Sequence, residues 1–372
     1  MVVYDEFGPE KILEVYDAAS GMKGFVVIDN TALGPAKGGI RMTASVSIDE
    51  VARLARAMTW KCSLAGLPFG GGKSGIIATP QQVSNKEEKH KLIRAFSMAI
   101  KPVCPRYYIA GPDINTTEKD MEVFAKANGN LKSATGKPAA LCVRPGVKCG
   151  IPHEYGSTGF GVYHAAMVAI RHLKINIHGA KIAIEGFGNV GTFTTEYLAK
   201  AGAKIVAVSD SRGCIYNEEG LDYKTLMKVK KEAGSVTAYK PGKIFESSKI
   251  HELDVDILIP GALPDVIHAG NVQKVKAKII VEAANIPMGP AMEEILHKKG
   301  ILVVPDIVAN AGGVISSYAE YKGYNPAKMF SLVERKIVKN TSLVLDKAKK
   351  EGMIPRDAAL AIAMEGVRNA RK

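Results

Sequence analysis

The sequence predicts an α/β protein of two domains, in which an N-terminal α/β domain precedes a Rossmann-type, doubly wound domain. Three observations carry this prediction. A glycine-rich motif at 186–191 joins a β-rich run to a helical pattern, and further β-rich runs alternate with helical stretches after it. The 372 residues, 47% of them hydrophobic, are enough for two hydrophobic cores. We predict domains over 1–152 and 153–334, with a helical tail over about 335–372 that packs back on the first domain.

Composition and charge exclude several classes of function. The net charge is +13, but the lysines are spread along the chain, without a long basic block, an RNA-reading aromatic motif or zinc-finger spacing. We therefore expect no nucleic-acid partner, and the basic balance suits anionic small molecules. No run of about eighteen apolar residues and no apolar signal core occurs, which predicts a cytoplasmic protein without a membrane partner.

The cysteines indicate neither a disulfide framework nor a metal site. Their odd number in a long chain predicts reduced thiols, and without a CxxC pair we expect no zinc or other metal. The five are Cys62, Cys104, Cys142, Cys149 and Cys214.

The first residues alternate between turn signals and short periodic runs. We predict a helix over 9–19, a strand over 24–34 and a glycine-rich turn over 34–41 that carries Lys37. A lysine in such a turn is either solvated, as most lysines are, or buried beside an anion.

The stretch from 58 to 75 holds two lysines. Ser47 and Glu50 form a capping-box pattern, and Lys61 falls near the end of the helix that it opens. We predict a turn at 70–72, where three glycines let the backbone pass close to another group. Lys73 follows, and a lysine in a cramped, partly apolar place can titrate near neutrality. A glycine hinge followed by a solvated lysine is the alternative.

The next segment alternates regular and irregular structure. We predict a helix over 85–101 and a short strand over 107–110 that ends in a turn presenting Asp113. An acid in that place can be catalytic, but Asp is also an ordinary turn residue. Residues 133–152 lack periodicity, which predicts an inter-domain connection or a loop, and a helix is predicted from 157 onward.

The second half opens with the dinucleotide-binding pattern. Gly186, Gly188 and Gly191 form a GxGxxG motif between a strand and a helix, and Asp210 ends the next strand about twenty residues later. Such glycines allow a tight turn and the approach of a pyrophosphate to a helix N-terminus. The alternative is a βαβ unit without a cofactor. Asn285 and Asn310 lie just beyond later β-rich runs, where doubly wound sheets bind ligands.

Taken together, these motifs resemble the Glu/Leu/Phe/Val amino-acid dehydrogenase family, and most closely its glutamate dehydrogenases. The resemblance rests on GPAKGGIRM, MTWKCSLAGLPFGGGKSG, GPDINT, STGFG, GFGNVG, AVSDS and ANAGGV, which occur in this order over nearly the whole chain. It implies a substrate-binding and oligomerisation domain, a dinucleotide-binding domain and an active-site cleft between them. It also implies NAD(P)-dependent oxidative deamination of an amino acid by a homo-oligomer, as a hexamer.

The resemblance also implies the roles of individual residues. Lys73 would be the catalytic lysine, and Asp113 the acid that exchanges a proton with the amino group. Lys61 would bind the α-carboxylate, with Met58 and Asn310 also at the substrate. The implied cofactor-binding residues are Thr158, Gly186, Phe187, Gly188, Asn189, Val190, Gly191, Asp210, Ser211 and Asn285.

Two positions imply the substrate. In glutamate enzymes of the family, the residues at Lys37 and Ser317 hold the side-chain carboxylate, whereas leucine- and phenylalanine-type enzymes are apolar in both places. We therefore expect glutamate, 2-oxoglutarate and ammonia as substrates. The short chain and its N-terminal part are more like the leucine-type enzymes, so a leucine, valine or phenylalanine dehydrogenase is the alternative. A catalytically weak, nucleotide-binding regulatory paralogue is another.

The sequence departs from the family pattern at two places near the expected nicotinamide site. A separate pair of signals leaves the choice between NAD and NADP open. The segment 137–157 is longer than in similar glutamate dehydrogenases, and Ile286 stands where glycine is common. Asp210 favours NAD by accepting from a ribose 2′-hydroxyl, but Ser211 and Arg212 beside it can hold a 2′-phosphate. We expect NADP or dual use.

Overall fold

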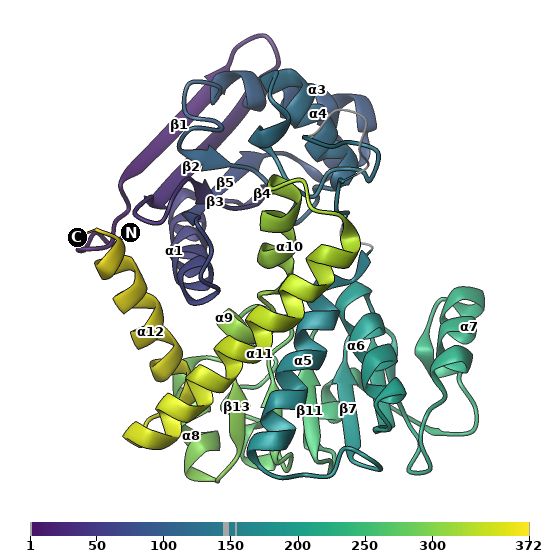
Figure 1. Ribbon diagram of the computed structural model, residues 1–372. Coiled ribbons are helices and arrows are strands. Elements are labelled where there is room, and N and C mark those ends of the chain that lie inside the picture. Colours follow the sequence, from purple (N-terminus) through teal and green to yellow (C-terminus); the bar gives the residue numbers. More distant parts are fainter. Residues whose placement is uncertain (1, 144–148, 153–154, 372) are drawn as a thin grey trace. The chain divides into compact units, whose positions relative to one another are not determined.

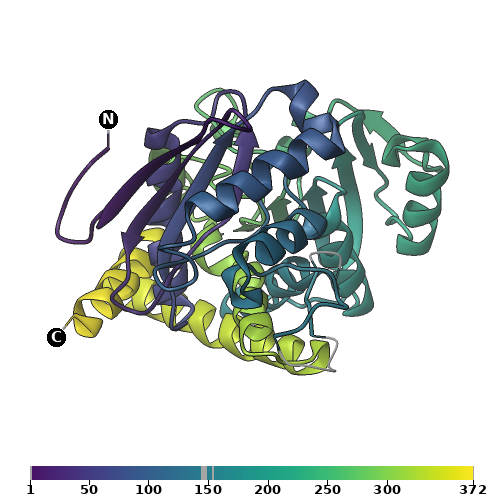
Figure 2. The same cartoon turned by 90° about the horizontal axis from the view of Figure 1, so that it is seen from above.

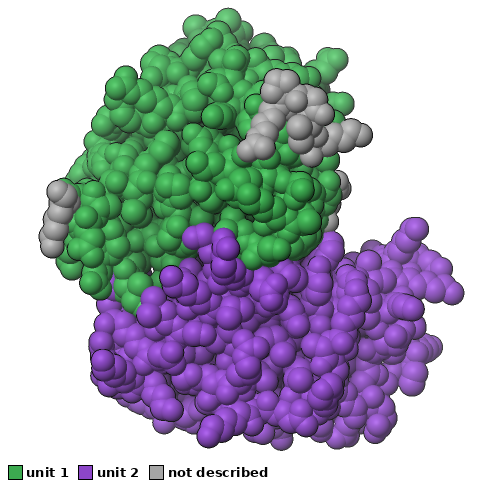
Figure 3. Space-filling model, in the orientation of Figure 1, with its two compact units in different colours: residues 1–155, 314–332, 362–372 green, residues 156–313, 333–361 purple. Residues whose placement is uncertain are grey.

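The computed structural model describes residues 2–143, 149–152 and 155–371. It divides into two compact units, coloured separately in Figure 3. Unit 1 comprises 1–155, 314–332 and 362–372, and unit 2 comprises 156–313 and 333–361. Residues 333–361 thus pack with unit 2, whereas the sequence placed the whole tail with the first domain. Each of the last two helices contributes residues to both units, so the tail does not belong to one unit alone.

Unit 1 is built on a six-stranded mixed sheet of order β1-β2-β5-β3-β6, with β4 also paired to β5 (Figure 1). Strand β2 is antiparallel to both of its neighbours, β1 and β5, whereas β3 and β4 run parallel to β5. The strands are β1 (Lys11–Asp17), β2 (Met22–Asn30), β3 (Ala36–Lys37), β4 (Ile40–Thr43), β5 (Gly70–Ile77) and β6 (Tyr108–Ile109).

Two predictions for unit 1 are wrong. The segment predicted as a helix over 9–19 forms edge strand β1, because Leu13 and its neighbours pair with β2. The glycines at 70–72 lie inside β5 and do not form a turn, just as 34–41 contains β3 and the start of β4. A Cβ on Gly71 would lie 2.1 Å from the backbone nitrogen of Thr59, so glycine is needed there for close helix–strand packing.

Helices cover both faces of this sheet, as Figure 2 shows from above. On one face, Val27 packs against helix α1 (Ile48–Leu64), and on the other Val26 packs with α3 (Lys86–Ala99) and α4 (Glu118–Asn128). The predicted N-cap is confirmed, because the Ser47 side chain accepts from the Glu50 backbone N–H. The Glu50 carboxylate does not complete the capping box and pairs instead with Arg41. Helix α2 (Pro80–Ser84) precedes α3.

Unit 2 contains a seven-stranded sheet of order β10-β9-β8-β7-β11-β12-β13. The five strands from β8 to β13 along this order are parallel, which confirms the predicted doubly wound domain. Its strands are β7 (Lys181–Glu185), β8 (Lys204–Asp210), β9 (Gly213–Tyr216), β10 (Lys243–Phe245), β11 (Ile257–Pro260), β12 (Ile279–Val281) and β13 (Leu302–Val304).

The helices of the second half complete the fold. Inside unit 2, Leu296 of α8 packs on Leu258 and Ile280 of the sheet, while Gly191 of α6 packs towards Ile184 on the strand beside it. The helices are α5 (Ser157–His172), α6 (Asn189–Lys200), α7 (Tyr223–Ala233), α8 (Pro290–Lys298), α9 (Asp306–Ala309), α10 (Gly312–Tyr321), α11 (Pro326–Glu351) and α12 (Pro355–Ala370). Over the residues that the structure describes, no helix is both long and apolar enough to cross a bilayer.

The cysteines correct another prediction. Cys142 and Cys149 form a disulfide, with Cα atoms 4.7 Å apart, so reduced thiols were wrongly predicted for this pair. Both lie in the segment 133–152, whose sequence shows no periodicity, so no local pattern indicated their pairing. The thiols of Cys62, Cys104 and Cys214 are free and buried. The described part of the chain contains no group of three or more His, Cys, Asp or Glu side chains placed to hold a metal.

Candidate active site and nucleotide-binding edge

Lys73 and Asp113 are brought together in unit 1. Lys73 lies on β5, and Asp113 follows β6 at the same sheet. The Lys73 Nζ is 3.1 Å from the Asp113 Oδ2, and the Arg41 Nε donates to the same oxygen at 2.9 Å. One carboxylate oxygen therefore bridges two cations.

Burial and the neighbouring charges shift the pKa values of Lys73 and Asp113. Lys73 has 8% of its surface exposed, and this burial lowers the pKa of Lys73 although Asp113 opposes the shift. Burial alone would raise the pKa of Asp113, but Lys73 and Arg41 hold it below its usual value. The arrangement provides an ionised carboxylate beside an amine that can give up its proton more readily than a solvated lysine.

Sequence reasoning missed Arg41. It lies on β4, opposite Gly75 of β5, and this register directs it to the carboxylate of Asp113. The turn after β6 is also fixed from β4, because the Thr116 hydroxyl donates to the Ile40 carbonyl and accepts from the Asp113 backbone N–H. The only available signal was the position of Arg41 inside the same GPAKGGIR motif as Lys37.

The next candidate, Lys37, is a buried lysine. It lies on β3 with 3% of its surface exposed, so the alternative of a solvated loop lysine is wrong. Its Nζ donates to the Ala110 carbonyl at 2.9 Å, and within the described residues no carboxylate lies close enough to form an ion pair with it. Burial lowers the pKa of Lys37 to about 7. An anion beside Lys37 would offset this cost of burial.

The other substrate-binding candidates of unit 1 lie on helices. Lys61 is in the last turn of α1, and Met58 is one turn earlier; both are half-buried. Ser317 lies on α10, also half-buried. The buried Glu320 follows it by three residues, and its Oε2 accepts from the backbone N–H groups of Gly136 and Ile151 at 2.7 and 3.2 Å.

The glycine motif of unit 2 has the geometry that a dinucleotide requires. Gly186 has φ of +88° in the turn after β7, and a Cβ on Gly191 would lie 1.8 Å from the Gly186 carbonyl oxygen. Gly188 faces open space, so a phosphate can approach its backbone at the start of α6. The Oδ1 of Asn189 is buried and has no hydrogen-bond partner among the residues that the structure describes. This orphaned acceptor and the open glycine fit a bound dinucleotide.

The other residues of the motif support this turn. Phe187 is buried, and Val190 is half-buried on the first turn of α6. Thr158 lies on the first turn of α5, and its hydroxyl oxygen would be 2.9 Å from a Cβ on Gly313. Residue 313 must therefore stay small for Thr158 to keep its place.

Asp210 is occupied within the protein. Its carboxylate accepts from the Lys230 Nζ at 2.7 Å, from the backbone N–H groups of Val236 and Arg212 at 2.9 Å each, and from the Ser235 hydroxyl at 3.1 Å. A carboxylate has about four acceptor positions, and these contacts fill them. This arrangement opposes the predicted role of Asp210 as the acceptor for a ribose 2′-hydroxyl. Ser211 beside it is exposed.

The loop after β12 is fixed by Asn310 and contains a strained residue. The Asn310 amide nitrogen donates to Asn285 Oδ1 at 3.1 Å and to the carbonyls of Ala283 and Ala284 at 3.2 Å. Ile286 has φ of +51°, which is unfavourable for a β-branched residue, and 45% of its surface is exposed. The departure at Ile286 is thus accommodated at a cost in backbone strain.

A cluster around Arg356 was not predicted. Its guanidinium contacts Glu282 at 2.6 Å, Asp306 at 3.0 Å and the carboxylate of Glu293, all inside unit 2. Asp306 also accepts from the Ile286 backbone N–H at 3.0 Å. One arginine therefore joins the first turn of α12 to the loops after β12 and β13.

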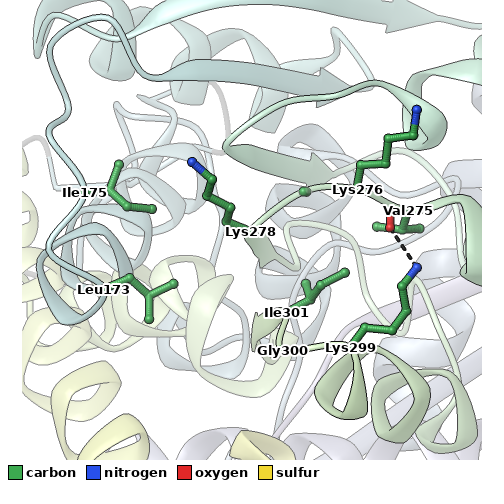
Figure 4. A pocket seen from close by; sticks show the side chains of 9 residues that line it. Leu173, Ile175, Val275, Lys276, Lys278, Lys299, Gly300 and Ile301 are labelled. Atoms are coloured by element: carbon green, nitrogen blue, oxygen red, sulfur yellow. Dashed lines mark hydrogen bonds between the residues drawn. The ribbon is translucent and has the colours of Figure 1, made fainter.

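A recess of about 600 Å³ lies at the amino ends of strands β12 and β13 of the unit 2 sheet (Figure 4). Lys276, Lys278 and Lys299 line it, before the first residues of β12 and β13, together with apolar side chains such as Ile301. Lys299 donates to the Val275 carbonyl at 2.9 Å, and Lys278 pairs with an aspartate. Since ligands of doubly wound sheets bind at the carboxyl ends of the strands, this recess is not the predicted site.

Comparison with known proteins identifies the family of this chain. The family model described as Glutamate/Leucine/Phenylalanine/Valine dehydrogenase matches residues 149–372, and the model of the Glu/Leu/Phe/Val dehydrogenase dimerisation domain matches residues 9–129. The chain belongs to the Glu/Leu/Phe/Val dehydrogenase family. The predicted resemblance and the two-domain α/β fold are thereby confirmed, and as a Glu/Leu/Phe/Val dehydrogenase the protein is an enzyme that uses a nicotinamide dinucleotide.

Individual members of the Glu/Leu/Phe/Val dehydrogenase family are similar over nearly the full length. Glutamate dehydrogenase of Aeropyrum pernix is 41% identical over 359 residues, covering 92% of this chain and 84% of that protein. NADP-specific glutamate dehydrogenase of Saccharolobus shibatae is 37% identical over 390 residues, covering 98% and 89%. The solved structure of hetero-hexameric glutamate dehydrogenase from Thermus thermophilus, Leu bound form, superposes with a TM-score of 0.85 at 27% identity and covers 97% and 89%.

Proposed function

We propose that this dehydrogenase catalyses the oxidative deamination of L-glutamate to 2-oxoglutarate and ammonia, and the reverse reductive amination. The observation that carries the proposal is Lys37, a buried lysine that forms no ion pair with a carboxylate among the described side chains. A substrate with a second carboxylate would supply the missing anion. The relatives named above as glutamate dehydrogenases support the same substrate.

Each site residue then has a chemical task. Lys61 holds the α-carboxylate, while Lys37 and Ser317 bind the distal carboxylate. Lys73 polarises the carbonyl oxygen of the oxoacid, and Asp113 exchanges a proton with the amino group or with the attacking ammonia. Residues 186–191 would hold the cofactor, with Thr158, Asn189 and Asn285 towards its nicotinamide end, and the cofactor would supply or accept the hydride.

The decisive assay follows reduced-cofactor absorbance with ammonia and either 2-oxoglutarate or 2-oxoisocaproate. We expect turnover with 2-oxoglutarate at a kcat/KM at least about 10²-fold higher, because an unmet buried charge rejects the apolar oxoacid. Turnover with the branched oxoacid alone would overturn the glutamate proposal. Nucleotide binding without turnover of any oxoacid would support the regulatory paralogue.

Replacing Lys37 with leucine should invert this preference. We expect kcat/KM for 2-oxoglutarate to fall by about 10²-fold or more, since a buried charge partner is removed, while activity on 2-oxoisocaproate rises. Parallel thermal unfolding tests whether the variant is folded, which we expect because leucine suits the buried position. An unchanged preference between the two oxoacids in a folded variant would show that Lys37 does not determine substrate specificity.

We further propose a preference for NADP. Asp210 is engaged by Lys230 and its neighbours, so its charge is neutralised and cannot favour a 2′-hydroxyl over a 2′-phosphate. Exposed Ser211 and Arg212 beside it provide a hydroxyl and a cation for the phosphate. We expect kcat/KM to be about tenfold or more higher with NADPH than with NADH, and Arg212→Gln to reduce that ratio through the KM for NADPH. A preference for NADH in the unmodified protein would contradict this.

The same proposal includes assembly and compartment. We propose a homohexamer, because residues 9–129 match a dimerisation domain and the superposed Thermus thermophilus enzyme is described as hetero-hexameric. The predicted cytoplasmic location stays a prediction from the sequence alone.

A further inference from the structure

The loop that follows β12 in unit 2 holds Ile286 in the left-handed region of backbone conformation, with φ of +51°. This conformation is strained for a β-branched residue, and such strain persists only where neighbouring groups hold it. The side chain contributes little packing that could do so, because 45% of the residue's surface is exposed. Contacts of the backbone must therefore hold Ile286.

Two hydrogen bonds fix the backbone of Ile286. Its N–H donates to the Asp306 Oδ2 at 3.0 Å, and its carbonyl accepts from the Asp265 backbone N–H at 3.0 Å. The second bond joins two backbone groups, whereas the first depends on the side chain of Asp306. Replacing Asp306 therefore removes one of the two bonds without changing any residue of the loop.

The Asp306 carboxylate is itself held in one orientation. It is buried, and its Oδ1 accepts from the Arg356 guanidinium at 3.0 Å while its Oδ2 accepts from Ile286. Glu282 and Glu293 contact the same guanidinium, so three carboxylates share one cation in the described part of unit 2. Like charges this close repel one another, and one arginine does not need a third acid. The contact with Ile286 gives this acid a different task.

The residue before Ile286 is Asn285, whose place at the nicotinamide end of the cofactor is part of the proposed function. The Asn285 Oδ1 accepts from the Asn310 amide at 3.1 Å, which fixes one side of the side chain. The planar peptide between Asn285 and Ile286 carries the N–H that Asp306 binds, so rotation of this peptide would move Asn285 as well. The orientation of Asn285 therefore depends on the contact between Asp306 and Ile286.

We propose that Asp306 is a positioning residue for the nicotinamide end of the cofactor. By binding the backbone of Ile286, it keeps Asn285 in the orientation that binds the ring, an inference that rests on the proposed function. When the bond is lost, Ile286 relaxes towards negative φ in a fraction of the molecules. The apparent affinity for the cofactor then falls with the fraction of molecules whose loop keeps the competent form.

The test measures binding to Asp306→Ala and to the unmodified enzyme by isothermal titration calorimetry. The ligands are NADPH and 2′-phospho-ADP-ribose, the same molecule without its nicotinamide ring; if NADH binds more tightly than NADPH, NADH and ADP-ribose take their places. We expect the Kd for the dinucleotide to rise about tenfold, whereas the Kd for the ligand without the ring stays within about twofold. The variant should fold, because Glu282 and Glu293 remain as partners of Arg356 and one of three like charges is removed.

A second variant tests whether the backbone of Ile286 is the link. Glycine adopts positive φ without strain, so Ile286→Gly in the Asp306→Ala background should restore the Kd for the dinucleotide to within about threefold of the unmodified value. A role of Asp306 in stability alone would not be rescued by a substitution at an exposed loop position.

The matched control is Asp256→Ala. Asp256 also joins a cation to a backbone N–H in unit 2, since it accepts from the Lys278 Nζ at 2.8 Å and the Lys181 N–H at 2.9 Å, but it lies at the amino end of β11. This variant should leave both Kd values within about twofold. An unchanged Kd for the dinucleotide in Asp306→Ala, equal weakening of both ligands, or failure of the glycine rescue would overturn the inference. Failure of the unmodified enzyme to use 2-oxoglutarate would instead overturn the proposed function, because the binding test involves no oxoacid.

Discussion

Replacing Lys73 with alanine is expected to lower kcat for glutamate oxidation by about 10²- to 10⁴-fold, the usual contribution of a positioned acid–base group. The structure gives the physical reason, since Lys73 is the buried amine that contacts Asp113. Affinity for the nucleotide should change little, because the glycine motif belongs to unit 2. Steady-state absorbance measures the first effect, and titration with reduced cofactor followed by fluorescence measures the second.

A lysine elsewhere in the same sheet provides the control. Lys23 on β2 is exposed, and Lys23→Ala should keep nearly full activity. In Lys73→Ala, Asp113 keeps its hydrogen bond from Arg41, so we expect the fold around the carboxylate to persist. Retained turnover in a folded Lys73→Ala variant would remove Lys73 from the mechanism.

Replacing Arg356 with methionine is expected to lower the free energy of unfolding by about 3–5 kcal/mol, the usual cost of removing one partner from a buried ion pair. Methionine fills similar space, but the carboxylates of Glu282, Glu293 and Asp306 lose the one cation that they share in the described structure. Denaturation by urea, followed by circular dichroism, measures the loss. Exposed Arg335 on α11 gives the control, since Arg335→Met should stay within about 0.5 kcal/mol.

The loss in Arg356→Met should depend on pH. Burial raises the pKa of Glu282 and of Glu293 in the folded protein, although Arg356 opposes the shift. The folded state therefore binds more protons than the unfolded chain, and these groups reduce stability as pH rises above their ordinary range. Without Arg356, a buried carboxyl group costs little stability when it is protonated and much more when it is charged. The loss of unfolding free energy in Arg356→Met should therefore become smaller as the pH falls towards about 5. A loss that is independent of pH would contradict this account.

The Rossmann-type unit could be predicted from the sequence because its signals are local. Its strands are short β-branched runs, and the motif from Gly186 to Gly191 lies between one of them and a helix. Unit 1 was harder. Strand β5 begins with three glycines, which carry no β-propensity and lie there because α1 approaches the backbone at Gly71. Strand β1 depends on its pairing with β2, which the local pattern of 9–19 does not reveal.

The candidate site shows the same limit. The residue types at Lys73 and Asp113 could be found from motifs, but Arg41 could not, because its contact with Asp113 spans 72 positions of the chain. The position of Asp210 at the end of a strand behind the glycines could be read from the sequence. Whether its carboxylate is free to bind a ligand depends on Lys230 and Ser235, which lie 20 and 25 residues further along the chain. Motif spacing identifies which groups are present, whereas hydrogen-bond saturation is a property of the folded chain.

Two interactions hold together residues before and after the same short segment: the disulfide between Cys142 and Cys149, and the hydrogen bonds to Glu320. The Glu320 carboxylate accepts from the backbone N–H of Gly136, before the cysteines, and from that of Ile151, after them. In a free chain, closing so short a ring would be worth about 2–3 kcal/mol, but ends that are already held together gain less from it. Reduction of the disulfide would therefore leave the hydrogen bonds to Glu320 in place, so the anchoring of Gly136 and Ile151 to α10 does not depend on the oxidation state of the two cysteines.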